Sequence, residues 1–214
     1  MIKIILSIVM LLISSNCLSS SFLVPSDYPD IQSGINASSS GDTIIISSGI
    51  YLEFDIVMKA GITLQGETKD PGNVIINAGN MDRAIDCYDL SELTTIQYIT
   101  IRGGYSVDGW TEALGGGIRS VNSIIKINNC IFINNRARIG AGVGALDSTI
   151  DIQDCVFTEN SATSNQWTAG GAIWAKNCDG TIDDCDVTNN SAFTFDGSLG
   201  DGAGFFFNHC NILV

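Results

Sequence analysis

The chain has 214 residues, of which 45% are hydrophobic and 15% are charged. That is enough apolar material to bury the core of one domain, and it excludes an intrinsically disordered chain. The net charge of -13 argues against nucleic acid or an anionic membrane as partner, because their phosphates would be repelled. An acidic polysaccharide is disfavoured for the same reason, unless a divalent cation bridges the charges.

Residues 1–21 have the layout of a secretory signal peptide. Lys3 precedes an apolar run from Ile4 to Ile13, and small polar residues follow. The run is too short to span a bilayer, and no later segment predicts a membrane span. We expect cleavage near residues 19–21 and one domain over residues 22–214, in a protein that is secreted or at the cell surface, with association to an outer membrane as one form of this. A lipoprotein signal ending at Cys17 is the alternative.

The next stretch, "SDYPDIQSGINASSSGDT", predicts one short amphipathic helix. Ser26 or Asp27 is the expected N-cap, Pro29 falls in the first turn, and Ile31 and Ile35 share one face. Short β-rich pieces follow up to residue 104, among them "DTIIISSGIY", "GITLQG" and "IQYITIRGG". They continue the later repeat less regularly.

Three copies of one pattern occupy residues 115–137, 140–162 and 170–192. Each opens on a Gly-rich step and contains a Cys with apolar residues three before and two after it. A polar pair lies between the first apolar residue and the Cys, which predicts a corner between two strands. The Gly-rich step leads to the inward residue of a third strand. Aligning Tyr98 with Cys130 extends the pattern backwards and places Gly103 where a column of Asn residues begins. The repeated positions are Cys130, Cys155 and Cys185; Ile127, Ile152 and Ile182; Phe132, Phe157 and Val187; Asn135, Asn160 and Asn190; Ile118, Val143, Ile173 and Phe205.

Three short strands per period, with no helical pattern between them, predict an all-β fold, the right-handed parallel β-helix, a β-solenoid of roughly six or seven coils. The short helix predicted in "SDYPDIQSGINASSSGDT" would cap its open end. Every residue then lies above its equivalent in the next coil, so one side chain suits the interior repeatedly. Asn tolerates the left-handed backbone of a bend, and its amide can bond to the amide above.

Six cysteines follow the predicted signal peptide. The repeat stacks Cys130, Cys155 and Cys185 in one column, which favours buried free thiols. Stacked strands lie about 4.8 Å apart, so a disulfide between two neighbours is also sterically allowed.

The stretch "VPSDYPDIQSGINASSSGDTIIISSGIY" resembles the opening of pectin lyase-like β-helix proteins, and the later part is similar to the repeat of polymorphic outer membrane proteins. The marks of that repeat are a G-G-A-[ILV] step and an F-x-x-N step. "GGAI" at 170–173 matches, "GGGI", "GAGV" and "GAGF" are variants, "FINN" and "FTEN" match, and "VTNN" departs at Val187. The resemblance implies the fold, but this architecture hosts lyases, hydrolases, esterases and adhesins alike.

No catalytic residue, metal site or cofactor is predicted. Asp183 and Asp184 resemble the paired Asp of polygalacturonases, yet they occupy the corner of the third repeat, and the companion motifs of that family do not occur. His209 is the only histidine and has no triad or metal set around it. Asp196 and Asp201 suit a calcium site, but their spacing fits neither the EF-hand nor the Gly-rich nonapeptide repeat.

Extra residues fall at one edge of the coils, after the Asn column. Insertions on one face of a solenoid often form its binding surface, and aromatic rings with carboxylates suit sugar rings and hydroxyls. The alternative is that the Trp side chains fold back as packing. The predicted ligand-binding residues are Tyr105, Asp108, Trp110, Glu112, Trp167 and Asp196, with Phe193 on the same edge.

These patterns predict a noncatalytic β-helix scaffold of adhesin-like or glycan-contacting type. Its partner would be a carbohydrate or a host or cell-surface ligand. The alternative is a polysaccharide-active enzyme whose catalytic coils lie beyond residue 214, and a spacer role is a third reading. "GAGFFFNHCNILV" begins a coil in register, so we expect the domain to be truncated at its C-terminal end; a complete chain would instead associate end to end.

Overall fold

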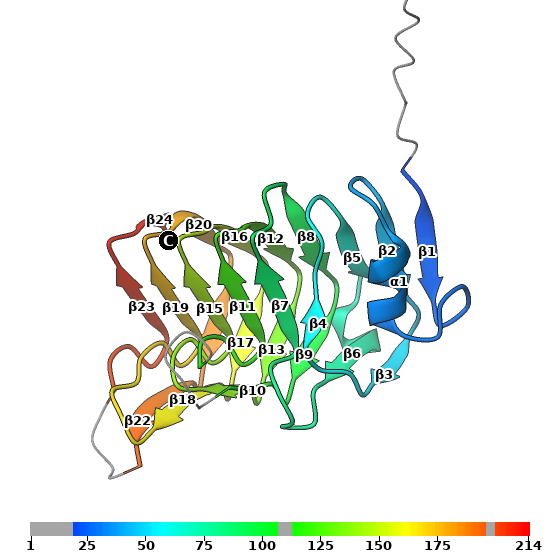
Figure 1. Cartoon of the computed structure of the whole chain (residues 1–214). Coiled ribbons are helices and arrows are strands. Elements are labelled where there is room, and N and C mark those ends of the chain that lie inside the picture. Colours follow the sequence, from blue (N-terminus) through cyan, green and yellow to red (C-terminus); the bar gives the residue numbers. More distant parts are fainter. Residues whose placement is uncertain (1–18, 107–112, 196–199) are drawn as a thin grey trace, which may run out of the picture.

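A computed structural model of the chain describes residues 19–106, 113–195 and 200–214. It is a parallel β-helix, in which short strands stack coil upon coil from the blue N-terminal end to the red strand at the other end (Figure 1). Every recorded strand pair is parallel, and four sheets run along the stack. The all-β parallel fold predicted from the repeat is confirmed.

The strands belong to four sheets, which we call A to D. Sheet A contains β1 (Ser21–Val24), β2 (Thr43–Ile46), β5 (Thr63–Gly66), β8 (Thr94–Gln97), β12 (Ile124–Asn128), β16 (Thr149–Gln153), β20 (Asp179–Asp183) and β24 (Asn211–Leu213). Sheet B contains β3 (Gly49–Tyr51), β6 (Val74–Asn77), β9 (Thr100–Arg102), β13 (Ile131–Ile133), β17 (Val156–Thr158) and β21 (Asp186–Thr188).

Sheets C and D complete the coils. Sheet C contains β4 (Ile56–Val57), β7 (Ile85–Tyr88), β11 (Ile118–Val121), β15 (Val143–Leu146), β19 (Ile173–Lys176) and β23 (Phe205–Asn208). Sheet D contains β10 (Tyr105–Ser106), β14 (Arg136–Ala137), β18 (Ser161–Ser164) and β22 (Ser191–Thr194). A 3-10 turn, η1 (Pro71–Asn73), precedes β6. Sheets B and C are six-stranded, which agrees with the predicted six or seven coils.

The coils with the clear repeat have four strands each, where the sequence predicted three. The fourth strand lies in sheet D and contains the Ala that ends each copy, so that Ala137 pairs with Ala162 and Ala162 with Ala192. Each strand in sheet D is short, from two to four residues. A two-residue strand shows too little alternation to be recognised from sequence.

The backward extension of the repeat was wrong by one residue. Phe132 pairs with Ile101, so Ile99, which is fully buried, occupies the position of Cys130. Tyr98 instead matches Asn129, and both have left-handed backbone angles, φ 58° and 51°. Gly104, not Gly103, lies opposite Asn135 and donates its N–H to that side chain. Tyr98 therefore lies half-buried at the corner between sheets A and B and is not one of the inward residues.

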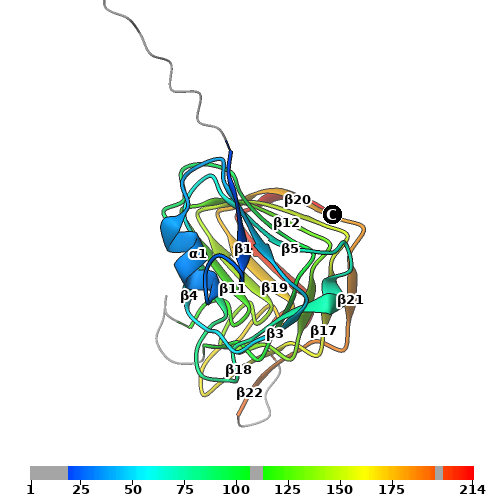
Figure 2. The same ribbon diagram turned by 90° about the vertical axis from the view of Figure 1, so that its right-hand side faces the viewer.

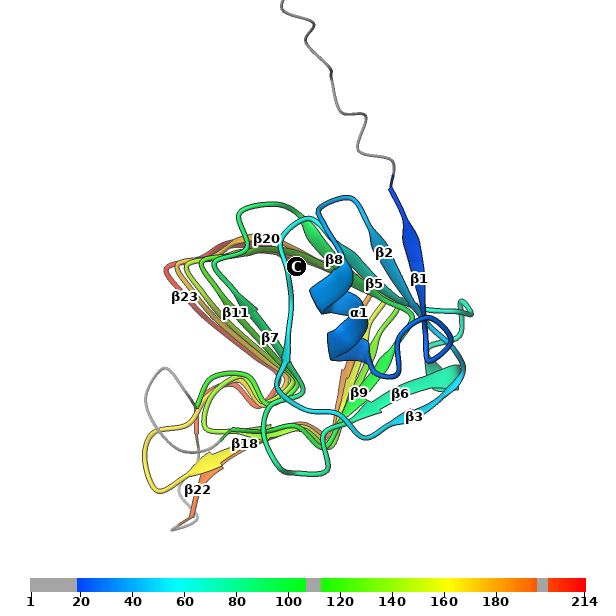
Figure 3. The same cartoon turned by 45° about the vertical axis from the view of Figure 1, so that its right-hand side comes forward.

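Helix α1 (Ile31–Ala37) begins later than predicted. Its N-cap is Asp30, whose Oδ1 accepts from the N–H of Ser33 at 2.7 Å. Asp27, one of the two predicted caps, instead accepts the N–H of Leu23 and closes a turn before the helix. The helix contacts β1, β2 and β4 and lies over the N-terminal end of the coils (Figures 2 and 3). Its buried face therefore covers the end of the core, as a capping helix must.

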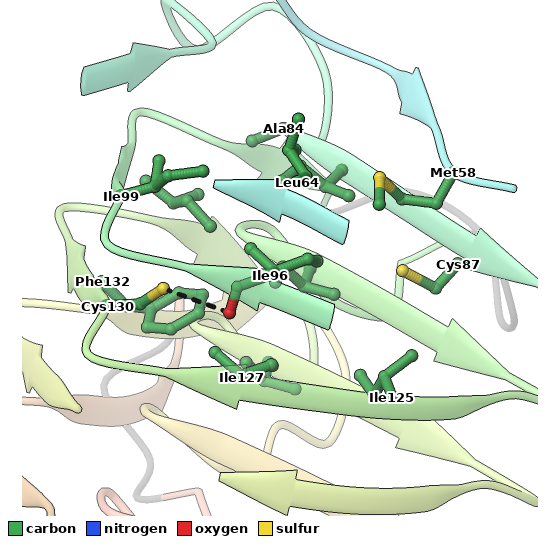
Figure 4. Packing of buried hydrophobic residues seen from close by; sticks show 14 of the residues in the cluster. Met58, Leu64, Ala84, Cys87, Ile96, Ile99, Ile125, Ile127, Cys130 and Phe132 are labelled. Atoms are coloured by element: carbon green, nitrogen blue, oxygen red, sulfur yellow. Dashed lines mark hydrogen bonds between the residues drawn. The ribbon is translucent and has the colours of Figure 1, made fainter. Parts of the chain in front are cut away.

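The interior is one continuous column of apolar side chains. Inward residues of sheets A, B and C meet between the strands, as Figure 4 shows for Ile127 of sheet A, Phe132 of sheet B and Cys87 of sheet C. Phe132 and Phe157 stack with ring centroids 4.6 Å apart and are fully buried. The predicted inward positions of the repeat are confirmed in the first two copies, while Phe205 and Val187 near the last coil are half-buried.

An asparagine ladder of Asn135, Asn160 and Asn190 runs through the corner between sheets B and D. Asn135 donates its side-chain N–H to Oδ1 of Asn160 at 3.0 Å, and Asn160 donates likewise to Asn190 at 3.0 Å. Each Oδ1 also accepts a main-chain N–H of the preceding coil. The predicted amide-to-amide contact is confirmed. The residue before each Asn, not the Asn itself, takes the left-handed conformation: Asn134, Glu159 and Asn189.

All six described cysteines are free thiols; Cys87 lies within β7, and the other five fill two corner columns. Cys130, Cys155 and Cys185 stack between sheets A and B, and each donates its S–H to the carbonyl oxygen two residues earlier. Cys178 and Cys210 do the same between sheets C and A, where earlier coils have Ser123 and Ser148. Either a thiol or a hydroxyl can therefore donate this hydrogen bond at the corner between sheets C and A.

The raised thiol pKa values predict slow alkylation of the folded protein. Burial raises the pKa of Cys178 to about 11, so roughly 0.1% of it is thiolate at pH 8, against about a quarter of an unperturbed thiol. Burial also raises the pKa of Cys87, and contact with neighbouring thiols raises that of Cys155 and Cys185. We expect iodoacetamide to label these positions slowly until denaturant is added, as followed by peptide mass spectrometry. Fast labelling of Cys178 in the folded protein would contradict this.

The same shift makes stability depend on alkaline pH. A group whose pKa is raised by folding stabilises the fold below its unfolded value and loses that contribution as pH rises through its folded value. The free energy of unfolding should therefore fall between pH 9 and about 11. Cys178→Ser is the matched control, because serine occupies the same corner in two other coils, and its decline over this range should be shallower.

Candidate functional site

The outer face of sheet C carries apolar side chains where a solvent-facing surface would carry polar ones. Alternate residues of each strand point outward, because the others fill the core. Trp174 is 7% exposed, and its neighbours in register are Gly144 and Phe206. A buried outward-facing row means that another part of the chain covers it. The apolar outward residues are Val121, Leu146, Trp174 and Phe206.

The covering segments are the chain stretches that lead from sheet D back to sheet C. They form a column of single parallel bridges from Leu114 to Ile139, Ala169 and Asp201. Leu114, Ile139 and Ala169 pack with Trp174 in a second apolar cluster, separate from the main core. Gly144 makes room for this layer, because a Cβ there would collide with the side chain of Leu114.

A groove of about 260 Å³ remains between this layer and the outer face of sheet C. We call it the sheet C groove. Its floor is apolar, its wall includes an indole ring, and three polar side chains complete the lining, of which Arg138 is buried and Lys176 is exposed. The lining residues are Leu114, Arg138, Ile139, Leu146, Trp167, Trp174, Lys176 and Asn208.

Trp167 is held in the wall of the groove by two contacts. Its indole N–H donates to Oδ2 of Asp201 at 2.7 Å, and its ring packs edge to face with Phe206, with centroids 5.4 Å apart. Even so, 43% of the residue remains exposed. Trp167 therefore packs on the solenoid, as the alternative expected, and still offers a fixed ring surface to solvent; its role in ligand binding stays a prediction.

Two cations line the groove. Arg138 is buried, and its Nε donates to the carbonyl oxygen of Trp167 at 3.2 Å, which fixes the main chain beneath the indole. Lys176 is exposed at the end of β19, between Leu146 and Asn208 in register. None of the lining residues that the structure describes is Asp or Glu. Lys176 thus places an exposed positive charge beside the groove, on a chain of net charge -13.

The buried indole of Trp174 has an unusual environment. Its N–H is shielded from solvent and has no hydrogen-bond acceptor among the described residues. Leaving a buried donor unpaired costs about 1–3 kcal/mol. Trp174 therefore contributes to the fold through its size and ring surface rather than through a hydrogen bond of its indole N–H.

The structure describes two of the six predicted ligand-binding residues. Trp167 lines the groove. Tyr105 does not line it: it lies in sheet D, 5.8 Å from the guanidinium of Arg136 in a cation–π contact. Phe193 lies in β22 and is 40% exposed. The other four, Asp108, Trp110, Glu112 and Asp196, lie outside the described residues.

The residues weighed for catalysis lie at solvent-facing corners. Asp183 and Asp184 are exposed at the end of β20, and Asp184 has the left-handed φ of 48° that its equivalents Asn129 and Asp154 share. His209 is exposed with φ 54° at the corner between sheets C and A. Asp201, weighed for calcium, accepts the Trp167 N–H. Within the described part of the chain, no three His, Cys, Asp or Glu side chains gather where they could hold a metal.

Seven of the lining residues were missed by the sequence reasoning, all except Trp167. A signal was present: the positions one and three residues after Ile118, Val143, Ile173 and Phe205 point outward, and several are apolar. An apolar residue at an outward position indicates a covered surface. What the sequence could not show is that stretches from three coils provide the cover.

Among the described residues, no helix combines the length and apolar character needed to cross a membrane. Comparisons with protein-family models, with curated proteins and with solved structures found no match.

Proposed function

We propose that this chain is a noncatalytic, carbohydrate-contacting module of a secreted or cell-surface β-helix protein. One observation carries the proposal: an indole ring, 43% exposed and fixed by a hydrogen bond and a ring contact, forms the wall of an apolar groove with polar groups at its rim. Sugars bind such surfaces through the apolar face of the ring and through their hydroxyls.

The rigidity of the groove supports a binding role. Its floor lies on strands β15 and β19 of sheet C. Each of these strands is hydrogen-bonded to a neighbouring strand on both sides. A side chain held in its bound orientation loses little conformational entropy when a ligand arrives. The groove is therefore pre-organised, which suits recognition of a small unit such as one sugar ring.

We also propose that the chain is related to pectin lyase-like proteins and to proteins with polymorphic outer membrane protein repeats. Supporting this, both marks of the repeat have a structural role here. The first Gly of the "GGAI" step, Gly170, has φ 64° in the turn before β19, and the Asn of the "FTEN" step is the buried Asn160 of the ladder. Export by the segment at residues 1–21 remains part of the same proposal.

Trp167→Ala tests the proposed function. We expect the purified domain to bind one or more members of a panel of plant and bacterial oligosaccharides, and the variant to bind at least about tenfold more weakly, because the stacking surface is lost. Isothermal titration calorimetry gives the affinity, as does the NMR shift of the Trp174 indole N–H, which lies in the same groove and is present in both proteins.

Phe195→Ala is the matched control, because this ring is also exposed but lies near Arg136 and not in the groove. Its affinity should equal that of the unmodified protein. Equal loss in both variants, or cleavage of an oligosaccharide in the panel, would contradict the proposed function.

A further inference from the structure

The charge of the sheet C groove differs from that of the whole molecule. The chain carries a net charge of -13, yet the described lining of the groove contains the cations Arg138 and Lys176 and no Asp or Glu. Within the described residues, no carboxylate lies within ion-pair distance of the Lys176 ammonium. A cation without an internal counter-charge, beside an apolar floor, is complementary to an anionic ligand.

The carboxylate of Asp201, which is hydrogen-bonded to Trp167, predicts how an anionic ligand is oriented in the groove. Asp201 accepts the Trp167 N–H at 2.7 Å, so this end of the groove repels an anion. Lys176 and Asn208 are partners in register on β19 and β23. Their side chains supply an ammonium and an amide, which donate hydrogen bonds to an oxyanion.

Building on the proposed function, we infer that the groove selects a sugar ring that carries an anionic substituent. The apolar face of the ring lies on Trp167, and the anionic group lies at Lys176 and Asn208. The chain as a whole repels acidic polysaccharides, so the attraction is local: a terminal or isolated acidic sugar is admitted, whereas a long polyanion meets the negative charge of the surrounding surface.

The test compares three probes that differ only at C6 of one sugar: methyl glucoside, its 6-sulfate and methyl glucuronide, together with their galacto counterparts. Affinities are measured by NMR titration at low salt, with the indole N–H resonances of Trp167 and Trp174 as site-specific reporters. We expect at least one anionic probe to bind about fivefold or more tightly than its neutral partner, and this preference to shrink in 0.5 M salt.

Lys176→Gln keeps the stem and removes the charge, so it should abolish the anionic preference, and the anionic probes should lose more affinity than the neutral one. Lys126→Gln, on the outer face of sheet A, is the matched control and should keep the preference. If neutral and anionic probes move the Trp167 resonance with equal affinity, the charge inference is wrong and the carbohydrate proposal stands. If no probe moves it, both are wrong.

Discussion

Replacing Phe157 with alanine is expected to lower the free energy of unfolding by about 3–5 kcal/mol, because a large ring is removed from a closely packed interior. Phe157 is fully buried and stacks on Phe132 with the two rings nearly parallel, 3° apart. Its strand, β17, is paired with β13 on one side and with β21 on the other. The backbone therefore cannot close around the cavity without breaking these pairings. Chemical denaturation followed by circular dichroism measures the change.

Phe195→Ala is the control for the same chemical change at an exposed site. Phe195 is 56% exposed, and its truncation should alter the free energy of unfolding by less than about 0.5 kcal/mol. An effect of Phe157→Ala as small as this would show that the inward assignment of the repeat is wrong. It would also remove the basis for the orientation of sheet C and of the groove.

Asn160→Ala is expected to destabilise the fold by about 2–4 kcal/mol, because two buried main-chain groups lose their partners. Asn160 is fully buried. Its Oδ1 accepts the N–H of Asn135 at 3.1 Å, and its Nδ2 donates to the carbonyl oxygen of Phe132 at 2.9 Å. Alanine can make neither contact. The side-chain amide of Asn135 also loses its acceptor in the next coil, Oδ1 of Asn160.

The position of the damage distinguishes the ladder from a general loss of packing. Hydrogen exchange of the main-chain N–H of Asn135 should accelerate in Asn160→Ala by more than the loss of global stability explains, because the acceptor of this N–H is gone. Asn211→Ala, at an exposed position of β24, is the control and should change the free energy of unfolding by less than about 0.5 kcal/mol. A loss below about 1 kcal/mol in Asn160→Ala would mean that water replaces the side chain.

The ladder and the groove share a structural origin. The corner that the ladder stabilises directs the chain into sheet D, and the stretch after sheet D returns over the outer face of sheet C to form the bridge column. Loosening of the corner should therefore be felt in the groove. The Trp167 resonance of Asn160→Ala, recorded where the protein remains folded, reports on this coupling.

The amino-acid sequence by itself determined the stacking and the direction of the repeated side chains. Strand alternation around Cys130 and Cys155 identifies which residues face inward, and polar pairs at fixed spacing identify the corners. Such local rules work because every coil presents the same environment to the same position. They failed where a coil was irregular, as at Tyr98, or where a strand was as short as Arg136–Ala137.

Only the tertiary structure decided the groove. Leu114, Ile139 and Trp167 come from three successive coils, and each meets Trp174 or its neighbours across the outer face of sheet C rather than along the chain. Aromatic and basic residues in the sequence do not reveal which of them share a surface, because that depends on how the stretches between sheets D and C fold back. The exposure of Trp167 and the isolation of the Lys176 charge follow from that packing.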